Sequence, residues 1–453
     1  MKQIFIAIAL LLVTGSCSTF SKYSRPASVA PDNLFGEDVI CSDTASAASI
    51  PWHEFFTDPR LQTLIHTALA NNSDLRIASL RVQQAEATLS AARLAYLPQV
   101  SLNPQGTISS FAGEKAAKTY SLGLSADWEI DISGRLTNEK REAYATLQQQ
   151  KYYRQAVSTQ LVATVANSYY NLLALDRQLS ISQQSLEAWN EIIRTLELRK
   201  TVGEGHQASV AQAQASRLDV ENTILSLSRQ IKTQENSLCT LLGWTPRKID
   251  RSDLKSQTFP ENIATGVPLR LLENRPDIRQ AEYALQSAFY STNAARSAFY
   301  PTLTLSGTAG WTNNSGAAIV NPGNWLLNAI GSLVQPLFNR GRNIANLKIA
   351  KARQEEALIT FQQKLLEAGA EVNDALSQWQ NAHQRLQVSA RQIEALQDAV
   401  KSTRLLMTYS ESGSYLEVLT AQQSLLSAQL TETQETFDKI QGIIKLYHAL
   451  GGG

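Results

Sequence analysis

Four stretches of the chain alternate between apolar and polar residues. They form two pairs, residues 99–108 with 120–132 and residues 302–311 with 325–338. A period of two is typical of a strand with one apolar and one polar face. We therefore expect four two-faced strands. Two residues break the alternation in the last stretch, Leu326 and Ile330.

Long helical patterns follow each pair of strands. No proline interrupts residues 137–201 or 342–411, and a turn and a shorter helical stretch follow each. At about 1.5 Å per residue, each long helix would be on the order of 100 Å long. Apolar residues recur at every seventh position, which predicts a seam along which neighbouring helices pack. The seam positions are Val165, Leu172, Leu179, Leu186 and Ile193, and later Leu358, Leu365, Val372, Trp379, Leu386, Ile393, Val400 and Met407.

The two halves of the chain repeat one another. Residues 92–102 return as residues 295–305 with the same residue at Ala92, Arg93, Ala95, Pro98 and Leu102. Each copy runs helix, two strands, very long helix, shorter helix. A repeat of this length indicates a duplicated subdomain rather than a solenoid unit. We place the copies at residues 58–242 and 268–450.

Charge and histidine spacing argue against several classes of protein. The chain has 41 Lys and Arg against 40 Asp and Glu, so no net field favours nucleic acid. The five histidines show no metal-ligand spacing, and no catalytic motif is present. We predict no enzyme activity, no metal site and no nucleic-acid partner.

The first residues read as a secretion signal. Lys2 precedes an apolar stretch, and Gly15 and Ser16 lead to Cys17. This resembles a bacterial lipoprotein cleavage site, with Cys17 to be lipidated; the alternative is an ordinary signal peptide with an incidental cysteine. We expect no other cofactor than this covalent lipid. Nothing later approaches the ~20 apolar residues of a membrane helix, so a membrane crossing would need a closed barrel.

Four strands cannot close a barrel, because even small bacterial barrels have about eight. The chain must oligomerise to cover its strand edges. The predicted fold is mainly α with a membrane β-barrel. Three copies, each giving four strands, would form a 12-stranded β-barrel continued by a long α-helical barrel.

Several motifs, in order along the chain, resemble those of TolC-like outer-membrane efflux proteins, in the lipoprotein subgroup that serves resistance-nodulation-division pumps. The most specific is Leu272-x-x-Arg275-Pro276-Asp277-Ile278-x-x-Ala281-Glu282. The others are Tyr23-Ser24-Arg25-Pro26, Trp52…Phe55…Asp58-Pro59…Leu61, the segment Asp127 to Arg135, and Leu446-Tyr447-x-Ala449-Leu450-Gly451-Gly452-Gly453.

The resemblance implies the exit duct of a tripartite efflux pump in the outer membrane of a Gram-negative bacterium. It also implies a homotrimer in contact with outer-membrane lipid, a periplasmic adaptor protein and an inner-membrane transporter, met directly or indirectly. The alternatives are an outlet for type I protein secretion and a lipid-anchored stalk. The expected divisions are a signal peptide (1–16), an extended lipid-anchored segment (17–57), a periplasmic helical barrel with an equatorial region (58–97, 134–300 and 339–453) and outer-membrane strands (98–133 and 301–338).

In this family, carboxylates beside the second helix–helix turn ring the closed periplasmic end. Here that motif retains Glu417 and has Thr420 at its second acidic position, so both are gate candidates. The alternative is that Glu417 is a solvated residue favoured by the helix dipole. Turn residues that would contact the adaptor are Gly203, Gly205 and Gly413.

Three acidic residues, Asp127, Glu129 and Asp131, share the polar face of one expected strand. If that face lines a lumen, they form an acidic wall in the trimer. The alternative is that they remain hydrated at the lower rim of the barrel. Trp128 on the opposite face would lie near the lipid interface.

Overall fold

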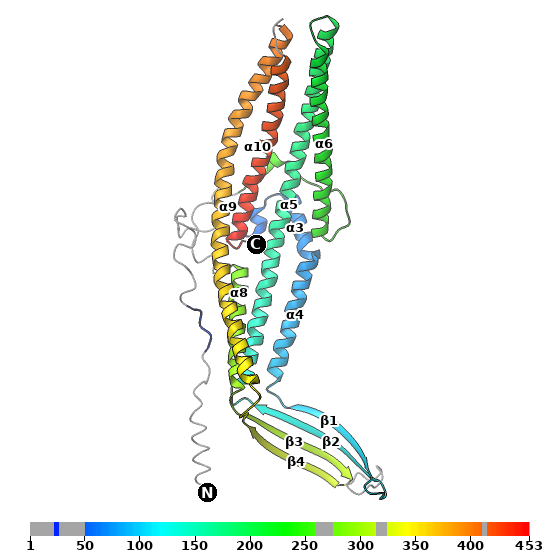
Figure 1. Cartoon of the computed structure of the whole chain (residues 1–453), viewed down its shortest axis with the longest axis vertical. Helices are drawn as coiled ribbons and strands as arrows, with labels where there is room; N and C mark the ends of the chain where they lie inside the picture. The colour runs from blue at the N-terminus through cyan, green and yellow to red at the C-terminus, as the bar shows by residue number, and fades with distance from the viewer. Residues whose placement is uncertain (1–21, 27–49, 260–274, 314–323, 410–414, 453) are drawn as a thin grey trace. The chain divides into compact units, whose positions relative to one another are not determined.

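The structure is a computed structural model that describes residues 22–26, 50–259, 275–313, 324–409 and 415–452. Two very long helices and one small sheet dominate it (Figure 1). The elements are α2 (Trp52–Phe55), α3 (Pro59–Asn71), α4 (Ser73–Leu94), β1 (Gln99–Ser109), β2 (Ala117–Ile130), α5 (Arg135–Thr201), α6 (Gln207–Leu241), η2 (Leu254–Ser256), α8 (Pro276–Ser297), β3 (Thr302–Asn313), β4 (Asn324–Val334), α9 (Arg342–Tyr409) and α10 (Tyr415–Ala449).

The elements fall into two compact units. Unit 1 takes its described residues from Met1–Ala30, Ser79–Tyr153 and Arg279–Lys364, and unit 2 from Pro31–Ala78, Arg154–Ile278 and Leu365–Gly453. Unit 1 thus contains the sheet, most of α4 and α8, and the first parts of α5 and α9. Unit 2 contains the remainder of α5 and α9, which form two hairpins with α6 and α10.

The sheet is antiparallel, in the order β1-β2-β3-β4. Its register places Leu102 opposite Leu124, which lies opposite Ala309, which lies opposite Leu327. The apolar residues therefore share one face, and the prediction of four two-faced strands is confirmed. Leu327 is 85% exposed, because nothing in the described chain covers this face.

The last strand is shorter than expected. We predicted it to residue 338, but β4 ends at Val334, two residues before Pro336. Proline lacks the amide hydrogen that a ladder requires. Of the two residues that break the alternation, Ile330 pairs with Ser306 and therefore belongs to the polar face, and Leu326 pairs with Gly310.

The helices of unit 1 form a layer in the order α4, α5, α8, α9. Apolar residues of α4 and α5 form one cluster, which includes Leu89 and Leu147. Tyr152 of α5 stacks on Tyr283 of α8 with ring centroids 5.5 Å apart. The Thr292 hydroxyl of α8 donates to the Ala350 carbonyl of α9 at 3.2 Å.

A single helix was expected before the strands of copy one, and the structure divides it into two. The break is at Asn72, between α3 and α4. The Asn72 side chain accepts hydrogen bonds from the amides of Asp74 and Leu75 at 2.9 and 3.1 Å, and donates to the Leu241 carbonyl. Asn72 therefore caps a new helix, a role for which asparagine is among the preferred residues.

The heptad seam of α9 is buried within the chain. Every predicted seam residue from Leu358 to Met407 is buried or half-buried, and Val372 is fully buried. In unit 2 the partner of the seam is α10: Ser389 donates to Glu435 at 2.5 Å. A Cβ on Gly442 of α10 would lie 3.0 Å from the Trp379 amide nitrogen, so the two helices approach closely here.

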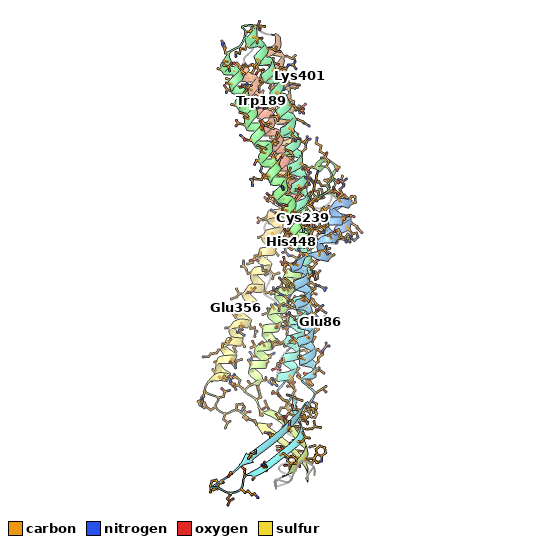
Figure 2. The ribbon with its side chains drawn as sticks, turned by 90° about the vertical axis from the view of Figure 1, so that its right-hand side faces the viewer. Glu86, Trp189, Cys239, Glu356, Lys401 and His448 are labelled. Carbon is orange, nitrogen blue, oxygen red and sulfur yellow. The ribbon has the colours of Figure 1, made fainter. Side chains whose placement is uncertain are left out.

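Within the described ranges, no helix is both long enough and apolar enough to cross a bilayer. Cys239 is a free, buried thiol in α6 (Figure 2). The other two cysteines lie outside the described residues.

Candidate functional site

The first hairpin turn is built on glycine. Gly203 follows α5 with φ +87°, a conformation that L side chains rarely adopt. Its amide donates to the Lys200 carbonyl and the Glu204 amide to the Arg199 carbonyl, at 3.1 and 2.9 Å. This pair of bonds is the Schellman motif, which satisfies the last carbonyls of a helix. A Cβ on Gly205 would lie 3.0 Å from the Lys200 nitrogen, so the predicted tip glycines both have steric reasons to be glycine.

The gate candidates lie together at the start of α10. Glu417 is an exposed residue in the first turn of this helix, and Thr420 is exposed one turn later. The Thr420 hydroxyl donates to the Leu416 carbonyl at 2.8 Å. The third tip glycine, Gly413, lies outside the described residues.

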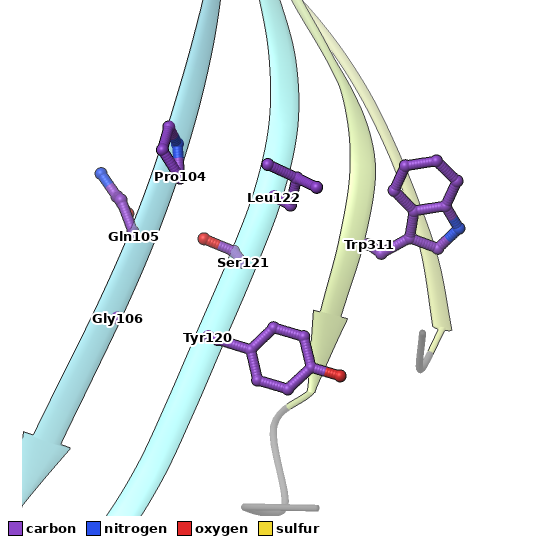
Figure 3. Close-up of a pocket in the computed structure, with 7 residues that line it drawn as sticks. All are labelled: Pro104, Gln105, Gly106, Tyr120, Ser121, Leu122 and Trp311. Carbon is purple, nitrogen blue, oxygen red and sulfur yellow. The ribbon is translucent and has the colours of Figure 1, made fainter. Parts of the chain in front are cut away.

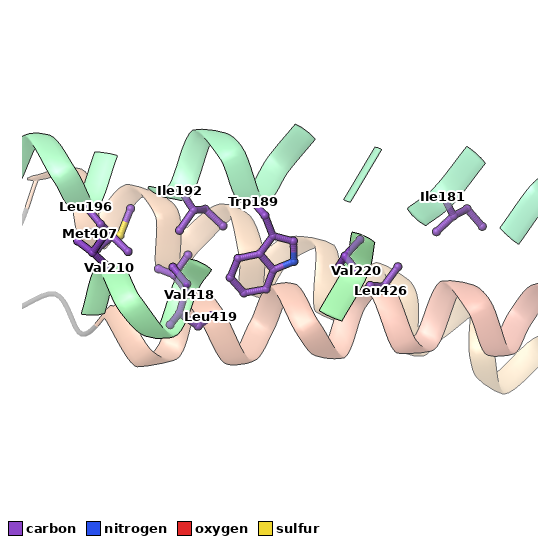
Figure 4. Packing of buried hydrophobic residues seen from close by; sticks show 11 residues of the cluster. Ile181, Trp189, Ile192, Leu196, Val210, Val220, Met407, Val418, Leu419 and Leu426 are labelled. Atoms are coloured by element: carbon purple, nitrogen blue, oxygen red, sulfur yellow. The ribbon is translucent and has the colours of Figure 1, made fainter. Parts of the chain in front are cut away.

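Beneath the turns, the two hairpins share one apolar core (Figure 4). We call it the tip core. Trp189 at its centre is fully buried. The buried members are Ile181, Trp189, Ile192 and Leu196 of α5, Val210, Ala213 and Val220 of α6, Met407 of α9, and Val418, Leu419 and Leu426 of α10. Because all four helices contribute, the two hairpins of one chain are packed together near their tips.

Polar contacts join the same two hairpins. Arg199 of α5 donates to the Met407 carbonyl of α9 at 2.5 Å. Arg404 of α9 lies 3.7 Å from a Glu191 carboxylate oxygen of α5 and donates to Gln422 of α10 at 3.4 Å. Sequence reasoning missed these residues, because no local pattern indicates which charges two distant helices bring together.

Of the three acidic candidates at the end of β2, two bind neighbouring residues at the start of α5. Arg135 donates to both carboxylate oxygens of Glu129, at 3.0 and 2.6 Å. Asp131 lies just past the end of β2 and accepts hydrogen bonds from the amides of Leu136 and Thr137, at 3.0 and 2.8 Å. Together they fix the first turn of α5 to the end of the strand.

Asp127 belongs to the polar face of the sheet itself. The Ser306 hydroxyl on β3 donates to its carboxylate at 2.6 Å. On the opposite face, the Trp128 indole donates to the Tyr96 carbonyl at 2.9 Å. Asp127 therefore differs from Glu129 and Asp131, because its hydrogen bond is to another residue on the polar face of the sheet.

Arg275 anchors the second hairpin. It is 3% exposed, donates to Asp277 and to Glu371 of α9 at 2.8 and 2.7 Å, and bonds the Ala449 carbonyl at the end of α10 at 2.9 Å. Burial disfavours ionised Asp277, but the hydrogen bond and charge of Arg275 outweigh burial, so the pKa of Asp277 falls below its ordinary value. The Arg-Pro-Asp motif thus ties α8, α9 and α10 together.

Arg251 has the corresponding position in the first hairpin. It binds Asp176 of α5 and Glu235 of α6, the latter at 2.5 Å. Its hydrogen bonds with Asp176, the largest influence, raise its pKa. Each hairpin of unit 2 is therefore joined at its base by one arginine and two carboxylates; Arg275 is buried and Arg251 is half-buried.

The described part of the N-terminal segment, residues 22–26, is docked on unit 1. Arg25 donates to Glu282 of α8 at 3.0 Å and its guanidinium lies over the Phe361 ring of α9. The Tyr23 ring meets Phe289 edge-on, with centroids 5.7 Å apart, and burial raises the Tyr23 pKa to about 12. Cys17 lies outside the described residues, five positions before this docked segment begins.

Comparison with known proteins places this architecture in a family. The family model described as "Outer membrane efflux protein" matches residues 64–244 and again residues 267–452. The double match confirms the predicted internal duplication.

Individual relatives match over nearly the whole chain. The cation efflux system protein CusC of Escherichia coli (strain K12) is 31% identical over 451 residues, which cover 98% of this chain and 97% of CusC. The probable outer membrane lipoprotein SilC of Salmonella typhimurium is 29% identical over 98% and 97% of the two chains. The open-state structure of the Neisseria gonorrhoeae MtrE outer membrane channel superimposes with a TM-score of 0.87, at 27% identity, over 96% of this chain and 98% of MtrE.

These matches confirm the mainly helical fold with four strands per chain, and a channel rather than an enzyme. The chain therefore belongs to the outer membrane efflux protein family and is the outer-membrane channel of an efflux pump of Gram-negative bacteria.

Proposed function

We propose that three copies of the chain assemble into one passive duct, whose sheets form a 12-stranded barrel in the outer membrane and whose helices form a tube in the periplasm. A periplasmic adaptor and an inner-membrane transporter of the resistance-nodulation-division type would feed this duct. In this proposal, residues 98–133 and 301–338 cross the membrane, and residues 58–97, 134–300 and 339–453 are periplasmic.

The observation that carries the proposal is the sheet. One face is apolar and exposed, the other is polar, and the outer edges of β1 and β4 pair with nothing in the described chain. Tyr120 and Trp128 lie on the apolar face eight residues apart, which spans about 27 Å along a strand. That spacing matches the ~25 Å apolar band, bounded by aromatic residues, of outer-membrane barrels. Pairing β4 of one copy with β1 of the next covers every edge and turns the polar face inward.

The lumen of such a duct would have little selectivity for its cargo. Among the described residues, no group of three or more His, Cys, Asp or Glu side chains is placed to hold a metal ion. The name of CusC refers to cation efflux. We propose that cargo choice lies with the transporter, and that Asp127 gives the lumen its local negative charge.

We further propose that the tips form the periplasmic gate and the adaptor contact. Three copies of Glu417 near one axis would repel each other and would favour a bound cation when the gate is closed. Gly203, Gly205 and Gly413 would shape the surface that the adaptor meets. Replacing Glu417 with Ala should weaken block of single-channel current by magnesium ions and leave the yield of trimer unchanged. Equal block in both proteins would show that the gate lies elsewhere.

Lipidation of Cys17 would add an anchor beside unit 1. The docked segment at residues 22–26 supports this, because it holds the chain that follows Cys17 against α8 and α9. Labelled palmitate should mark the wild type, and Cys17→Ala should abolish the label. Equal labelling would contradict the assignment.

The duct itself is tested in a planar bilayer. The purified protein should have three times the mass of one chain and should conduct ions in discrete steps. A monomeric protein, or a trimer without conductance, would contradict the proposal.

A further inference from the structure

A groove lies on the apolar face of the sheet, toward the turn that joins β1 to β2 (Figure 3). Its volume is about 400 Å³, within the ~300–1,000 Å³ range of ligand sites. The residues of this face that line it are Pro104, Gly106, Tyr120, Leu122 and Trp311.

The groove exists because of two small residues on β1. Gly106 pairs with Tyr120, and Pro104 pairs with Leu122. A Cβ placed on Gly106 would meet no atom within 4 Å, so the space beside the Tyr120 ring is open. In Figure 3 the rings of Tyr120 and Trp311 project to the opposite side of the strands from the Ser121 and Gln105 side chains. Two aromatic rings and one open slot thus form an elongated apolar site.

One charge lies beside this site. The described strands contain three charged residues, Lys118, Asp127 and Glu129, and only Lys118 has the register of the apolar face. It lies two residues beyond Tyr120, about 7 Å further toward the hairpin turn. Glu114 and Lys115 in that turn offset each other's charge, so Lys118 gives this end of the apolar face its positive charge.

We propose that this groove binds an acylated, phosphorylated glycolipid of the outer leaflet. An acyl chain would lie over Gly106 and across the Tyr120 ring toward Trp311, and the Lys118 ammonium would contact a phosphate. The inference rests on the proposed orientation of the sheet, with its hairpin turns at the outer surface of the membrane. A lysine near the interface of a barrel costs little, and its chain can extend toward the head groups.

The site is tested on the full-length protein in mild detergent by native mass spectrometry with added lipid A. Gly106→Leu fills the slot, and Lys118→Glu reverses the charge. Each variant is expected to weaken lipid A binding about four- to five-fold. Gly307→Leu is the matched control, because it adds the same bulk to the same face outside the groove and should bind as the wild type does.

Further arms identify the ligand. Dephosphorylated lipid A and phosphatidylglycerol should both bind more weakly than lipid A, and inorganic phosphate should not displace it. Equal binding by the wild type and Gly106→Leu, equal binding of any of these lipids, or displacement by phosphate would overturn the proposal. Planar-bilayer conductance tests the proposed duct separately from lipid binding. Both variants should conduct as the wild type does. A wild type without conductance would contradict the duct but would not affect the lipid-binding result.

Discussion

The sheet of unit 1 and the hairpins of unit 2 treat their apolar residues in opposite ways. In the hairpins, Trp189 and Val372 are fully buried against neighbouring helices of the same chain. In the sheet, Leu102, Leu327 and Leu333 are all more than half exposed. The hairpins therefore contain a core of their own, whereas the apolar face of the sheet requires lipid outside the chain.

This contrast explains why one chain combines two kinds of sequence pattern. A seam with a period of seven is satisfied by the next helix, so it stabilises the protomer. A face with a period of two is left open by a single sheet, so it stabilises the protein only after insertion. Substitutions in the two regions should accordingly fail in different environments.

The largest effect is expected in the seam. Val372→Asp would bury an unpaired carboxylate, which costs several kcal/mol in a dry site. Val388→Asp on the same helix is the control, because Val388 is 56% exposed. Urea unfolding, followed by circular dichroism, should show a large loss in the free energy of unfolding for Val372→Asp and little change for Val388→Asp. Equal stability of wild type and Val372→Asp would refute the buried seam.

A smaller loss is expected on the lipid-facing side of the sheet. Leu327→Arg should cost about 2–4 kcal/mol near the bilayer midplane, whereas Asn328→Arg, one residue along on the polar face, should be tolerated. The readout is the fraction of protein that resists urea extraction from membranes. If both variants insert equally well, the two faces have been assigned wrongly.

Next in size is the arginine at the base of the second hairpin. Arg275→Met keeps the volume but leaves Asp277 and Glu371 without their partner; because both carboxylates are partly solvated, we expect a loss of about 2 kcal/mol. Thermal unfolding measures it. The double variant with Glu371→Gln should lose less than the sum of the two single variants, since both remove the same ion pair.

The smallest effect is a pH dependence of unit 2. Burial, with Arg275 nearby, lowers the pKa of His448 below its ordinary value of 6.5. The unfolded chain then binds the proton more readily, so this contribution to stability is complete above pH ~6.5 and declines as the pH falls below that value. His448→Gln should flatten the profile of stability against pH below pH ~6.5. If the slope of stability against pH is the same in wild type and variant, the pH dependence comes from other groups.

The periodic features could be predicted from sequence. Many residues together indicate each of these features: the seam of α9, the alternation of β2 and the repeat. Single-residue events were harder: Asn72 caps α4 and breaks a helix that periodicity alone continues. Its amide has the chemistry of a cap, but the Leu241 carbonyl that holds it lies on another helix.

The site was predicted only as far as its residues act locally. Gly203 was identified from the turn that follows a long helix and from the family resemblance, and its left-handed backbone is a local reason for glycine at that position. Asp131 was expected on the polar face of a strand, but it binds the first turn of α5, because β2 ends one residue earlier. Trp189, Arg199 and Arg404 act across hairpins, and no local spacing indicates such contacts.

The central claim is that neighbouring residues of one strand face water on one side and lipid on the other. Ser125→Cys on the polar face and Leu124→Cys on the apolar face test it directly, in a planar bilayer with a membrane-impermeant charged thiol reagent and the wild type as control. We expect a stepwise fall in conductance for Ser125→Cys and none for Leu124→Cys or the wild type. Block at Leu124→Cys with none at Ser125→Cys would contradict it.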